Sequence, residues 1–259
     1  MPIKKLVSDW RAAGIEEGDT LLLHSSLKRT LIKYARAGYK LTPDAILSSF
    51  IEALGPSGTL ILPLFNFSFT NGLTFDIRHS PSHMGALTES GRTMTGSVRT
   101  GHPVYSFSAI GKHTDAFRGI DNQSGYGTDS PFAKLRELDG KIGILNLSDQ
   151  NSMTFYHHVE EMNDVPYRHH KSFSGAYIDA HGVQTIKTYS IFVRNLEDGV
   201  LTHVDPMGER LWRAGIYQGF KHDEDCGLRL CKANNVFSFV SDAINRDEAY
   251  GNLYKTADS

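Results

Sequence analysis

Short apolar runs bounded by glycine alternate with longer amphipathic stretches along most of this sequence. Residues 20–24 and 59–63 have the length and composition of buried strands, whereas residues 43–54 between them show the apolar spacing of a helix. The alternation continues with a helix at residues 84–94 and a short strand near residues 106–110. This rhythm predicts an α/β fold.

The second half of the sequence extends this pattern and then changes it. After Pro166, two segments of alternating residues flank Ala180-His181-Gly182, which predicts a β-hairpin with a tight connection. Residues 114–128, which contain several Gly, Asp and Asn residues, are expected to form a long surface loop. The remaining expected elements are helices at residues 131–138, from about 153, at 205–214 and at 235–244, strands at 142–147 and 227–231, and hairpin strands at 174–179 and 185–191.

The composition is that of an ordinary globular chain. With 259 residues, a formal net charge of −2 and no linker rich in proline, serine or glycine, the sequence predicts a single domain over residues 1–259. No run of lysine and arginine interleaved with aromatic residues is present, so we expect no nucleic-acid partner. The expected partners are small-molecule substrates, and a homo-oligomer is left open.

Cysteine usage and hydropathy indicate the setting in which we expect the protein to work. Cys226 and Cys231 form neither a C-x-x-C pair nor a disulfide framework, which favours a reducing compartment and argues against structural zinc. Adjacent histidines diverge on a helix and rarely chelate one ion, so no metal is expected. The N-terminal residues show no leader-like apolar core, and no segment approaches the roughly 18 apolar residues of a membrane span. We therefore expect a cytoplasmic protein without a membrane partner.

The segment that follows the expected strand at residues 142–147 concentrates groups able to transfer protons. On a helix, His157 and Glu160, and likewise His158 and Glu161, lie three residues apart and share a face. A histidine titrates near neutral pH, and a neighbouring carboxylate orients its ring and raises its basicity. The pattern therefore suits a general base, although adjacent His and Glu on a helix also suit an ordinary solvated surface.

Three polar residues, His24, Ser25 and Ser26, end the first expected strand. At the carboxyl end of a strand, their hydroxyls and amides are placed to cradle an anionic group. The alternative is that Ser25 and Ser26 merely cap the helix that follows, and the spacing does not distinguish the two.

A further polar segment spans residues 99–109. Its cation, imidazole and hydroxyls suit a phosphate or pyrophosphate, whereas a lone histidine before proline, such as His102, also suits a hydrogen-bonded structural turn. Nearby Asp76 is placed either to pair with a substrate ammonium or to neutralise Arg78 or Arg99. No P-loop, GxGxxG, HExxH or GxSxG motif is present, which removes the common nucleotide-binding, zinc-protease and esterase functions.

Six segments in a fixed order carry a wider resemblance. They are HSSL (24–27), GTLILP (58–63), FDIRHSPSHMGALTESGR (75–92), R-T-G-HPVYSFSAIG (99–111), Y-G-T-DSPFAKL (126–135) and T-FYHHVEE (154–161). Together they resemble the antibiotic N-acetyltransferase family, best known for the aminoglycoside 3-N-acetyltransferases, from about Asp19 to the terminal helix. The resemblance implies a three-layer α/β/α sandwich distinct from the GNAT fold, here with an inserted β-hairpin. It also implies acyl transfer from acyl-coenzyme A, as co-substrate, to a primary amine on a sugar.

The resemblance assigns roles residue by residue. His157 matches the family's T-x-x-H-x-x-E histidine, with Thr154 and Glu160 completing the motif, so His157 is favoured over His158. In the implied mechanism His157 accepts a proton as the amine attacks the thioester, and Asp76 is a further catalytic candidate. No metal and no covalent acyl-enzyme are implied. The residues expected to contact the coenzyme are His24, Ser25, Ser26, Arg99, His102, Ser106, Ser130 and Thr154.

The expected acceptor follows from the charge and aromatic content of residues 65–71, which we expect to line the acceptor side of the site. Aminoglycosides are polycations that favour clefts dense in carboxylates, whereas residues 65–71 are aromatic and neutral. The sequence from residue 154 to 168 also departs from the leucine-rich version typical of resistance enzymes. We therefore expect a nucleotide-linked amino-deoxysugar, as in surface-polysaccharide or lipopolysaccharide pathways, with aminoglycoside acetylation as the alternative and a non-catalytic binding protein as a third hypothesis. The residues expected to bind the acceptor are Phe65, Phe67, Tyr126 and Arg168.

Overall fold

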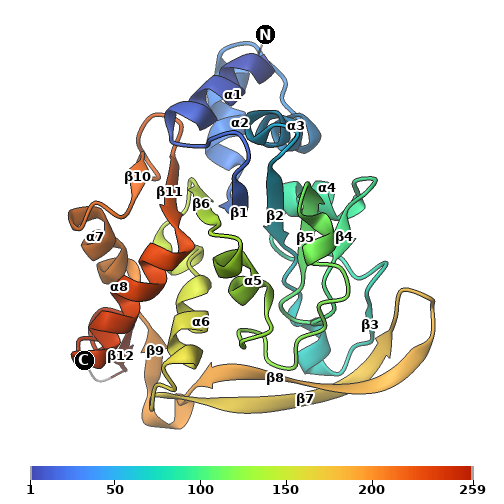
Figure 1. The fold of residues 1–259 in the computed structure, drawn as a ribbon, viewed down its shortest axis with the longest axis vertical. Helices are drawn as coiled ribbons and strands as arrows, with labels where there is room; N and C mark the ends of the chain where they lie inside the picture. Colours follow the sequence, from blue (N-terminus) through green and yellow to red (C-terminus); the bar gives the residue numbers. More distant parts are fainter. Residues whose placement is uncertain (1, 258–259) are drawn as a thin grey trace.

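The computed structural model describes residues 2–257 and centres, within them, on a seven-stranded mixed sheet (Figure 1). The spatial order of its strands is β10-β11-β6-β1-β2-β5-β4. β1 pairs in parallel with β2 on one side and with β6 on the other, and the remaining pairs are antiparallel. The strands span Thr20–Ser25 (β1), Thr59–Pro63 (β2), Val98–Arg99 (β4), Phe107–Gly111 (β5), Lys141–Leu145 (β6), Gln218–Gly219 (β10) and Leu228–Lys232 (β11).

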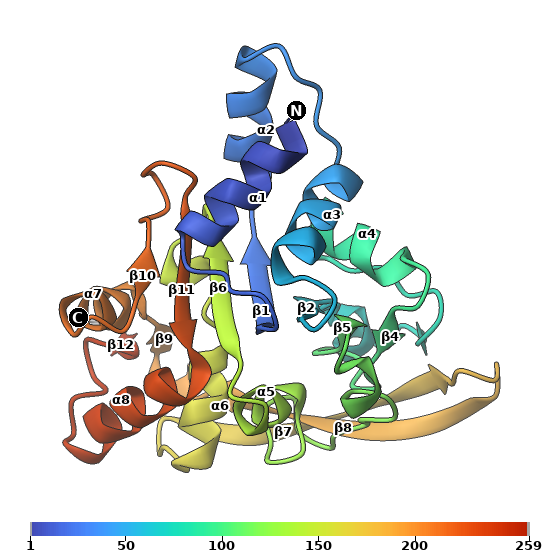
Figure 2. The same ribbon diagram turned by 45° about the horizontal axis from the view of Figure 1, so that its top comes forward.

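Both faces of this sheet are buried under helices. Leu21 and Leu23 of β1 join one hydrophobic cluster and Leu22 joins another, because successive side chains of a strand face opposite sides. Figure 2 shows α1 and α3 lying together at one end of the molecule, away from α6 and α8. The Leu21 cluster includes side chains of α1 (Pro2–Ala12), α2 (Lys28–Arg36), α3 (Pro43–Leu54) and α4 (Ala86–Thr93), and the Leu22 cluster includes those of α5 (Pro131–Glu137), α6 (Phe155–Met162), α7 (Asp205–Arg213) and α8 (Ala233–Asn245). The expected three-layer α/β/α architecture is confirmed.

A long β-hairpin runs along one edge of the molecule (Figure 1). Its strands β7 (Arg168–Ile178) and β8 (Gln184–Arg194) pair from Arg168↔Arg194 at the root to Ile178↔Gln184 beside the turn. The hairpin is longer than the sequence predicts because its root is buried in the core at Ile191 and Phe192. The other short elements are β3 (Phe75–Asp76), which pairs with β7, β9 (Val200–Thr202), which pairs with β12 (Tyr254–Thr256), and the 3-10 turns η1 (Phe67–Asn71), η2 (Thr114–Ala116), η3 (Asp149–Asn151) and η4 (Leu196–Asp198).

Most elements lie where the hydrophobic pattern predicts them, and two helices do not. The helix expected at residues 43–54 and the strand expected at 59–63 coincide with α3 and β2. The hydrophobic pattern does not predict helices α1 and α2. In α2, four of the nine residues are basic and only Thr30 and Tyr34 are buried, so no apolar face is visible in the sequence. Within residues 2–257, no helix has both the length and the apolar character that crossing a bilayer requires.

Residues 114–128 form the expected loop, but only part of it lies at the surface. The ring of Tyr126 is 2% exposed and lies 4.7 Å from the ring of Tyr105, centroid to centroid. The main chain of Gln123 accepts a hydrogen bond from the N–H of Ser190 at 2.9 Å, which ties the segment to β8. Because the hairpin supplies these partners from far along the chain, a polar composition is compatible with burial here.

We predict that Gly111→Ala lowers the free energy of unfolding by more than Gly119→Ala, the matched control. Both glycines have positive φ, of 119° and 78° respectively, so each substitution introduces conformational strain of about 1–2 kcal/mol. A Cβ at Gly111 would also lie 2.3 Å from the carbonyl oxygen of Gly58, whereas nothing lies within 4 Å of one at Gly119. Urea unfolding should show the difference, and equal losses would contradict it.

Candidate functional site

Helix α6 presents one of its histidines to the surface. Phe155 and Val159, four residues apart, bury one face of the helix in the core. His157 lies off that face, is half-buried, and lines two adjoining clefts. Thr154, the residue before the helix, lines the narrower of the two. Core packing therefore fixes where the His157 ring reaches solvent.

A buried carboxylate holds the His157 ring. Nδ1 of His157 lies 2.7 Å from Oε2 of Glu160, whose side chain is 1% exposed. The same carboxylate oxygen lies 2.8 Å from Nε of Arg168, and Nη1 of Arg168 donates to the carbonyl oxygen of Phe192 at 3.1 Å. Because Glu160 accepts at Nδ1, the proton of the uncharged ring sits on Nδ1 and the Nε2 lone pair is left to accept a proton.

Burial and the Arg168 charge set the protonation of this pair. Burial lowers the pKa of His157 below its ordinary value and Arg168 lowers it further, against the opposing hydrogen bond to Glu160. Burial alone would raise the pKa of Glu160, but Arg168 and the His157 ring outweigh it and hold that pKa below its ordinary value. Near neutral pH the pair is therefore a carboxylate beside an uncharged imidazole.

The second histidine and carboxylate of the segment do not pair. His158 is fully buried, and its Nδ1 donates to the carbonyl oxygen of Tyr126 at 2.6 Å. Burial lowers the pKa of His158 to about 4. Glu161 instead accepts a hydrogen bond from the Ser124 hydroxyl at 2.8 Å. His157 is therefore the histidine of this segment that reaches a cleft.

Two clefts of different size meet at His157. The wider has a volume of about 470 Å³ and the narrower about 190 Å³. Both are lined by His157, Tyr105, Gln150 and Thr202. The wider cleft adds Tyr126, Arg168, Arg194 and residues 191–193 of the hairpin, and the narrower adds Phe65, Phe67, Met84 and Thr154.

The surface around this junction is neutral or positive. Among the described residues that line the wider cleft, Arg168 and Arg194 are charged and none is a carboxylate. The narrower cleft includes Asp149, but its carboxylate accepts the Tyr156 hydroxyl at 2.6 Å and pairs with Arg229 at 2.7 Å. A polycationic ligand would therefore meet no uncompensated negative charge on these lining residues.

Comparison with known protein families shows which family this chain belongs to. The family model described as aminoglycoside 3-N-acetyltransferase matches residues 22–245. This chain belongs to that family. The match extends from β1 to the last turn of α8, so it contains the whole central sheet apart from the first residues of β1.

Curated members of the family are distant relatives of this chain. Aminoglycoside N(3)-acetyltransferase VII of Streptomyces paromomycinus is 26% identical over 182 residues, which cover 62% of this chain and 61% of that protein. Aminoglycoside N(3)-acetyltransferase III of Pseudomonas aeruginosa is 28% identical over 184 residues, covering 63% of this chain and 65% of that protein. Each match therefore spans less than two thirds of the relative's length.

Solved structures of the family share the fold over nearly the whole chain. The binary complex of AAC-IIIb with CoASH superposes with a TM-score of 0.79 at 21% identity, covering 95% of this chain and 96% of the other. Aminoglycoside acetyltransferase AAC(3)-Xa gives a TM-score of 0.77 at 24% identity, covering 95% and 92%. At such identities the likeness establishes the fold of this family member.

The R-x-x-HP-x-x-S segment is built into the fold rather than into a cleft. Nε of Arg99 donates to Oγ of Ser106 at 3.1 Å, and its Nη1 donates to two main-chain carbonyls. His102 is fully buried: its Nδ1 accepts the Tyr105 N–H at 3.0 Å, and its Nε2 donates to the carbonyl oxygen of Ser190 at 3.2 Å. The hydrogen bonds of these three side chains are to other parts of the protein, but the buried Nη2 of Arg99 has no partner among the described residues, so the coenzyme roles of Arg99, His102 and Ser106 stay predictions.

Ser130 and Asp76 are also held by contacts within the protein. Ser130 is fully buried, and its Oγ accepts the N–H of Ala133 at 3.4 Å, which caps α5. Asp76 accepts Nε and Nη2 of Arg78 at 3.1 and 3.0 Å. In the pairing of β3 with β7, Asp76 lies opposite Ile178, beside the hairpin turn. The ten residues of extended strand between Ile178 and Arg168, at the root of β7, span about 30 Å. Asp76 therefore neutralises Arg78 and is not a catalytic residue beside His157.

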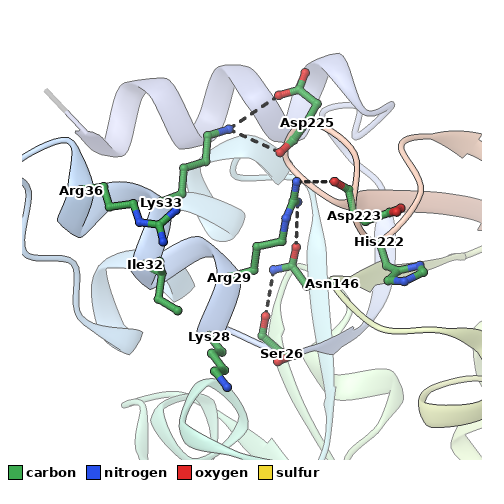
Figure 3. Close-up of a pocket in the computed structure, with 10 residues that line it drawn as sticks. All are labelled: Ser26, Lys28, Arg29, Ile32, Lys33, Arg36, Asn146, His222, Asp223 and Asp225. Carbon is green, nitrogen blue, oxygen red and sulfur yellow. Dashed lines mark hydrogen bonds and ion pairs between the residues drawn. The ribbon is translucent and has the colours of Figure 1, made fainter.

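The three polar residues at the end of β1 differ in accessibility. His24 is buried, and burial lowers its pKa to about 4. Ser25 is half-buried at the strand end. Ser26 lines a separate groove of about 640 Å³ beside α2 (Figure 3). Ser26 is thus the member of this motif with a side chain at the groove, and the coenzyme role of the motif stays a prediction.

The residues expected to bind the acceptor lie around His157. Phe65 and Phe67 line the narrower cleft and Tyr126 lines the wider, and their binding roles stay predictions. Arg168 lines the wider cleft, but its guanidinium is engaged by Glu160. Arg168 therefore holds the carboxylate that orients the histidine, and its expected role in binding the acceptor stays a prediction.

Four further lining residues are ones that sequence reasoning does not single out: Tyr105, Gln150, Arg194 and Thr202. Tyr105 lies inside a recognised motif, so its position carried a signal. Gln150 lies in the turn η3 close to the histidine segment. Arg194 and Thr202 reach the clefts only through the return of β8 and β9, which no local pattern reveals.

We predict that the two partners of the ring move the pKa of His157 in opposite directions. Arg168→Met removes a positive charge, so this pKa should rise, and Glu160→Gln removes the acceptor that favours the imidazolium, so it should fall. An NMR titration of the His157 Cε1 proton measures both, with exposed Arg118→Met as the charge-matched control. Shifts of the same sign in both variants would contradict the arrangement.

Proposed function

We propose that this chain is an N-acyltransferase that moves an acyl group from acyl-coenzyme A to a primary amine of an amino sugar, with His157 as general base. The proposal rests on the position of His157, an uncharged ring oriented by the buried Glu160 carboxylate where two clefts meet. Two clefts at one proton acceptor suit a reaction in which two substrates exchange a group. The printed names of the curated relatives describe acetyltransferases, which supports the same chemistry.

Amide formation requires such a base. A sugar ammonium must lose a proton before its nitrogen attacks a thioester, which is the form in which coenzyme A supplies the acyl group. As the C–N bond forms and the C–S bond breaks, Nε2 of His157 accepts the amine proton and later returns it to the departing sulfur. Glu160, 2.7 Å from Nδ1, stabilises the imidazolium that forms in between.

Direct transfer agrees with the placement of the other reactive groups. Thr154 lines the narrower cleft beside His157, where its hydroxyl and nearby main-chain amides suit the developing oxyanion. Cys226 and Cys231 are buried, and burial raises the pKa of both thiols. Neither cysteine lines the clefts at His157, so an acyl-cysteine step is not part of the proposal.

The acceptor best supported by the comparisons is an aminoglycoside. The curated relatives are named aminoglycoside N(3)-acetyltransferases, from Streptomyces, Pseudomonas and other bacteria. These names support aminoglycoside acetylation better than the nucleotide-linked amino sugar that the sequence led us to expect. The identities of 26% and 28% leave room for a changed acceptor within the same chemistry.

One observation favours the nucleotide-linked amino-deoxysugar as a second candidate. The described lining of the wider cleft contains Arg168 and Arg194 but no carboxylate, and Asp149 of the narrower cleft is already paired. Polycations bind where negative charge is left over, whereas a diphosphate is attracted by Arg194. The aromatic rings of Phe65 and Phe67 offer stacking surfaces for a base or a deoxysugar.

We predict that His157→Ala lowers kcat for acyl transfer by about 10²- to 10⁴-fold, the range that a general base contributes. Coenzyme A affinity should remain near that of the wild-type protein, since the ring is placed as a proton acceptor. His181→Ala, at the exposed hairpin turn, is the matched control and should retain full activity. Thiol release and calorimetry measure the two quantities. Undiminished turnover in His157→Ala would refute the role of the ring.

We predict that the charge of the wider cleft decides between the two acceptors. If an anionic nucleotide sugar is the acceptor, Arg194→Glu should raise its KM at least tenfold and leave the KM for an aminoglycoside unchanged or lower. Thiol release with an aminoglycoside panel and with nucleotide-linked amino sugars provides the comparison. Faster turnover of aminoglycosides by the wild-type protein would select the first candidate and exclude the second.

A further inference from the structure

Tyr105 lies at the junction of the two clefts. It is one of four residues that line both, together with Gln150, His157 and Thr202. The side-chain amide of Gln150 is already used within the protein, because Nε2 donates to the carbonyl oxygen of Thr202 at 3.2 Å and Oε1 accepts the N–H of Val204 at 3.0 Å. In the proposed transfer the new bond forms where the two substrates meet, so a hydrogen-bond donor on the wall that both clefts share is close to the reacting atoms.

The ring of Tyr105 is held in one position. Its main-chain N–H donates to Nδ1 of the buried His102 at 3.0 Å. The ring meets the rings of Phe65 and Phe67 edge to face, at centroid distances of 4.7 and 5.8 Å. A Cβ at Gly125 would lie 2.8 Å from Cδ2 of Tyr105, so the neighbouring chain lies directly against the ring. The side chain is therefore ordered before any substrate binds.

The Tyr105 hydroxyl is set up to donate a hydrogen bond. It accepts one from the hydroxyl of Tyr126, a contact that lowers the pKa of Tyr105 and raises that of Tyr126. Burial nevertheless raises the pKa of Tyr105 above its ordinary value, against that contact and the charges of Arg168 and Arg194. The hydroxyl therefore keeps its proton near neutral pH, and accepting a bond from Tyr126 strengthens its own donation. The ring of Tyr126 lies 5.3 Å from the His157 ring, centroid to centroid, which places this pair of tyrosines beside the base.

We infer that the Tyr105 hydroxyl donates a hydrogen bond to the oxyanion that forms during acyl transfer, which makes Tyr105 a second catalytic residue beside His157. The inference rests on the proposed function. As the amine nitrogen bonds to the thioester carbon, the carbonyl electron pair moves onto oxygen, and the Tyr105 hydroxyl stabilises that charge without giving up its proton. When the pair returns, the C–S bond breaks and the departing sulfur takes the proton from His157. Tyr105 thus adds a donor to those near Thr154, and Tyr126 is a positioning residue that acts through it.

The first experiment is Tyr105→Phe, which removes the hydroxyl and keeps the packed ring. We expect kcat for acyl transfer to fall by about 10²- to 10³-fold, the range for loss of one oxyanion donor. The KM values and coenzyme A affinity should change little, because the bond is made in the transition state and not in the bound ground state. Tyr39→Phe removes the same group from a ring that is 47% exposed outside the clefts, and should retain full activity. Thiol release measures the kinetics.

A second variant separates chemistry from structure. Incorporating 3,5-difluorotyrosine at position 105 keeps the ring and the hydroxyl but lowers the pKa of the phenol. The variant should recover the kcat that Tyr105→Phe loses, and should lose it again as the pH rises through the lowered phenol pKa. The wild-type protein should show no such loss over the same pH range. A pH profile identical to that of the wild-type protein would contradict a role for the hydroxyl proton.

The outcomes distinguish this inference from the proposed function. If His157→Ala abolishes transfer while Tyr105→Phe keeps full kcat, the inference fails and the function stands. The inference is also overturned if Tyr105→Phe raises KM and leaves kcat unchanged, or if Thr202→Val causes the loss of kcat in place of Tyr105→Phe. If the wild-type protein transfers no acyl group to any aminoglycoside or nucleotide-linked amino sugar, both fail together.

Discussion

The arrangement of this protein around its histidine depends on one buried carboxylate oxygen. Oε2 of Glu160 lies within 2.8 Å of both the His157 ring and the Arg168 guanidinium, at a place almost closed to water. A buried carboxylate is costly unless it is paired, so Arg168 is what allows Glu160 to stay charged beside the ring. Arg168 is also the first residue of β7, which means that the hairpin is attached to the core at the same point that sets the histidine's charge.

The features predicted from sequence are those encoded locally. The His157 and Glu160 pair follows from a spacing of three residues on a helix, and the α/β order follows from the length of apolar runs. The partnership of Arg168 with Glu160 depends on how the hairpin root packs, so the sequence suggested a free phosphate-binding cation instead. The contact of His102 with the carbonyl oxygen of Ser190 likewise depends on packing, whereas the Asp76–Arg78 pair is local and was one of the alternatives that the sequence offered.

The resemblance to a family pointed to His157, which the structure places where two clefts meet, and to coenzyme contacts that stay predictions. A polar motif such as R-x-x-HP-x-x-S can bind a ligand or close a turn, and the internal hydrogen bonds of Arg99 and His102 show that it does at least the second here. The basic face of α2 is a feature that sequence reasoning did not assign to any site. Its lysines and arginines are visible in the sequence, but they become a groove only when α2 lies against Asn146 and the residues after β10.

The segment at residues 114–128 is tied down on both sides of the wider cleft. The carbonyl oxygen of Tyr126 accepts a hydrogen bond from Nδ1 of His158, the Ser124 hydroxyl donates to Glu161, and the carbonyl oxygen of Gln123 accepts the Ser190 N–H. A wall anchored to α6 and to β8 at once is not free to swing open as a lid. If the proposed function holds, acceptor choice depends on the side chains that line a preformed cleft rather than on loop motion.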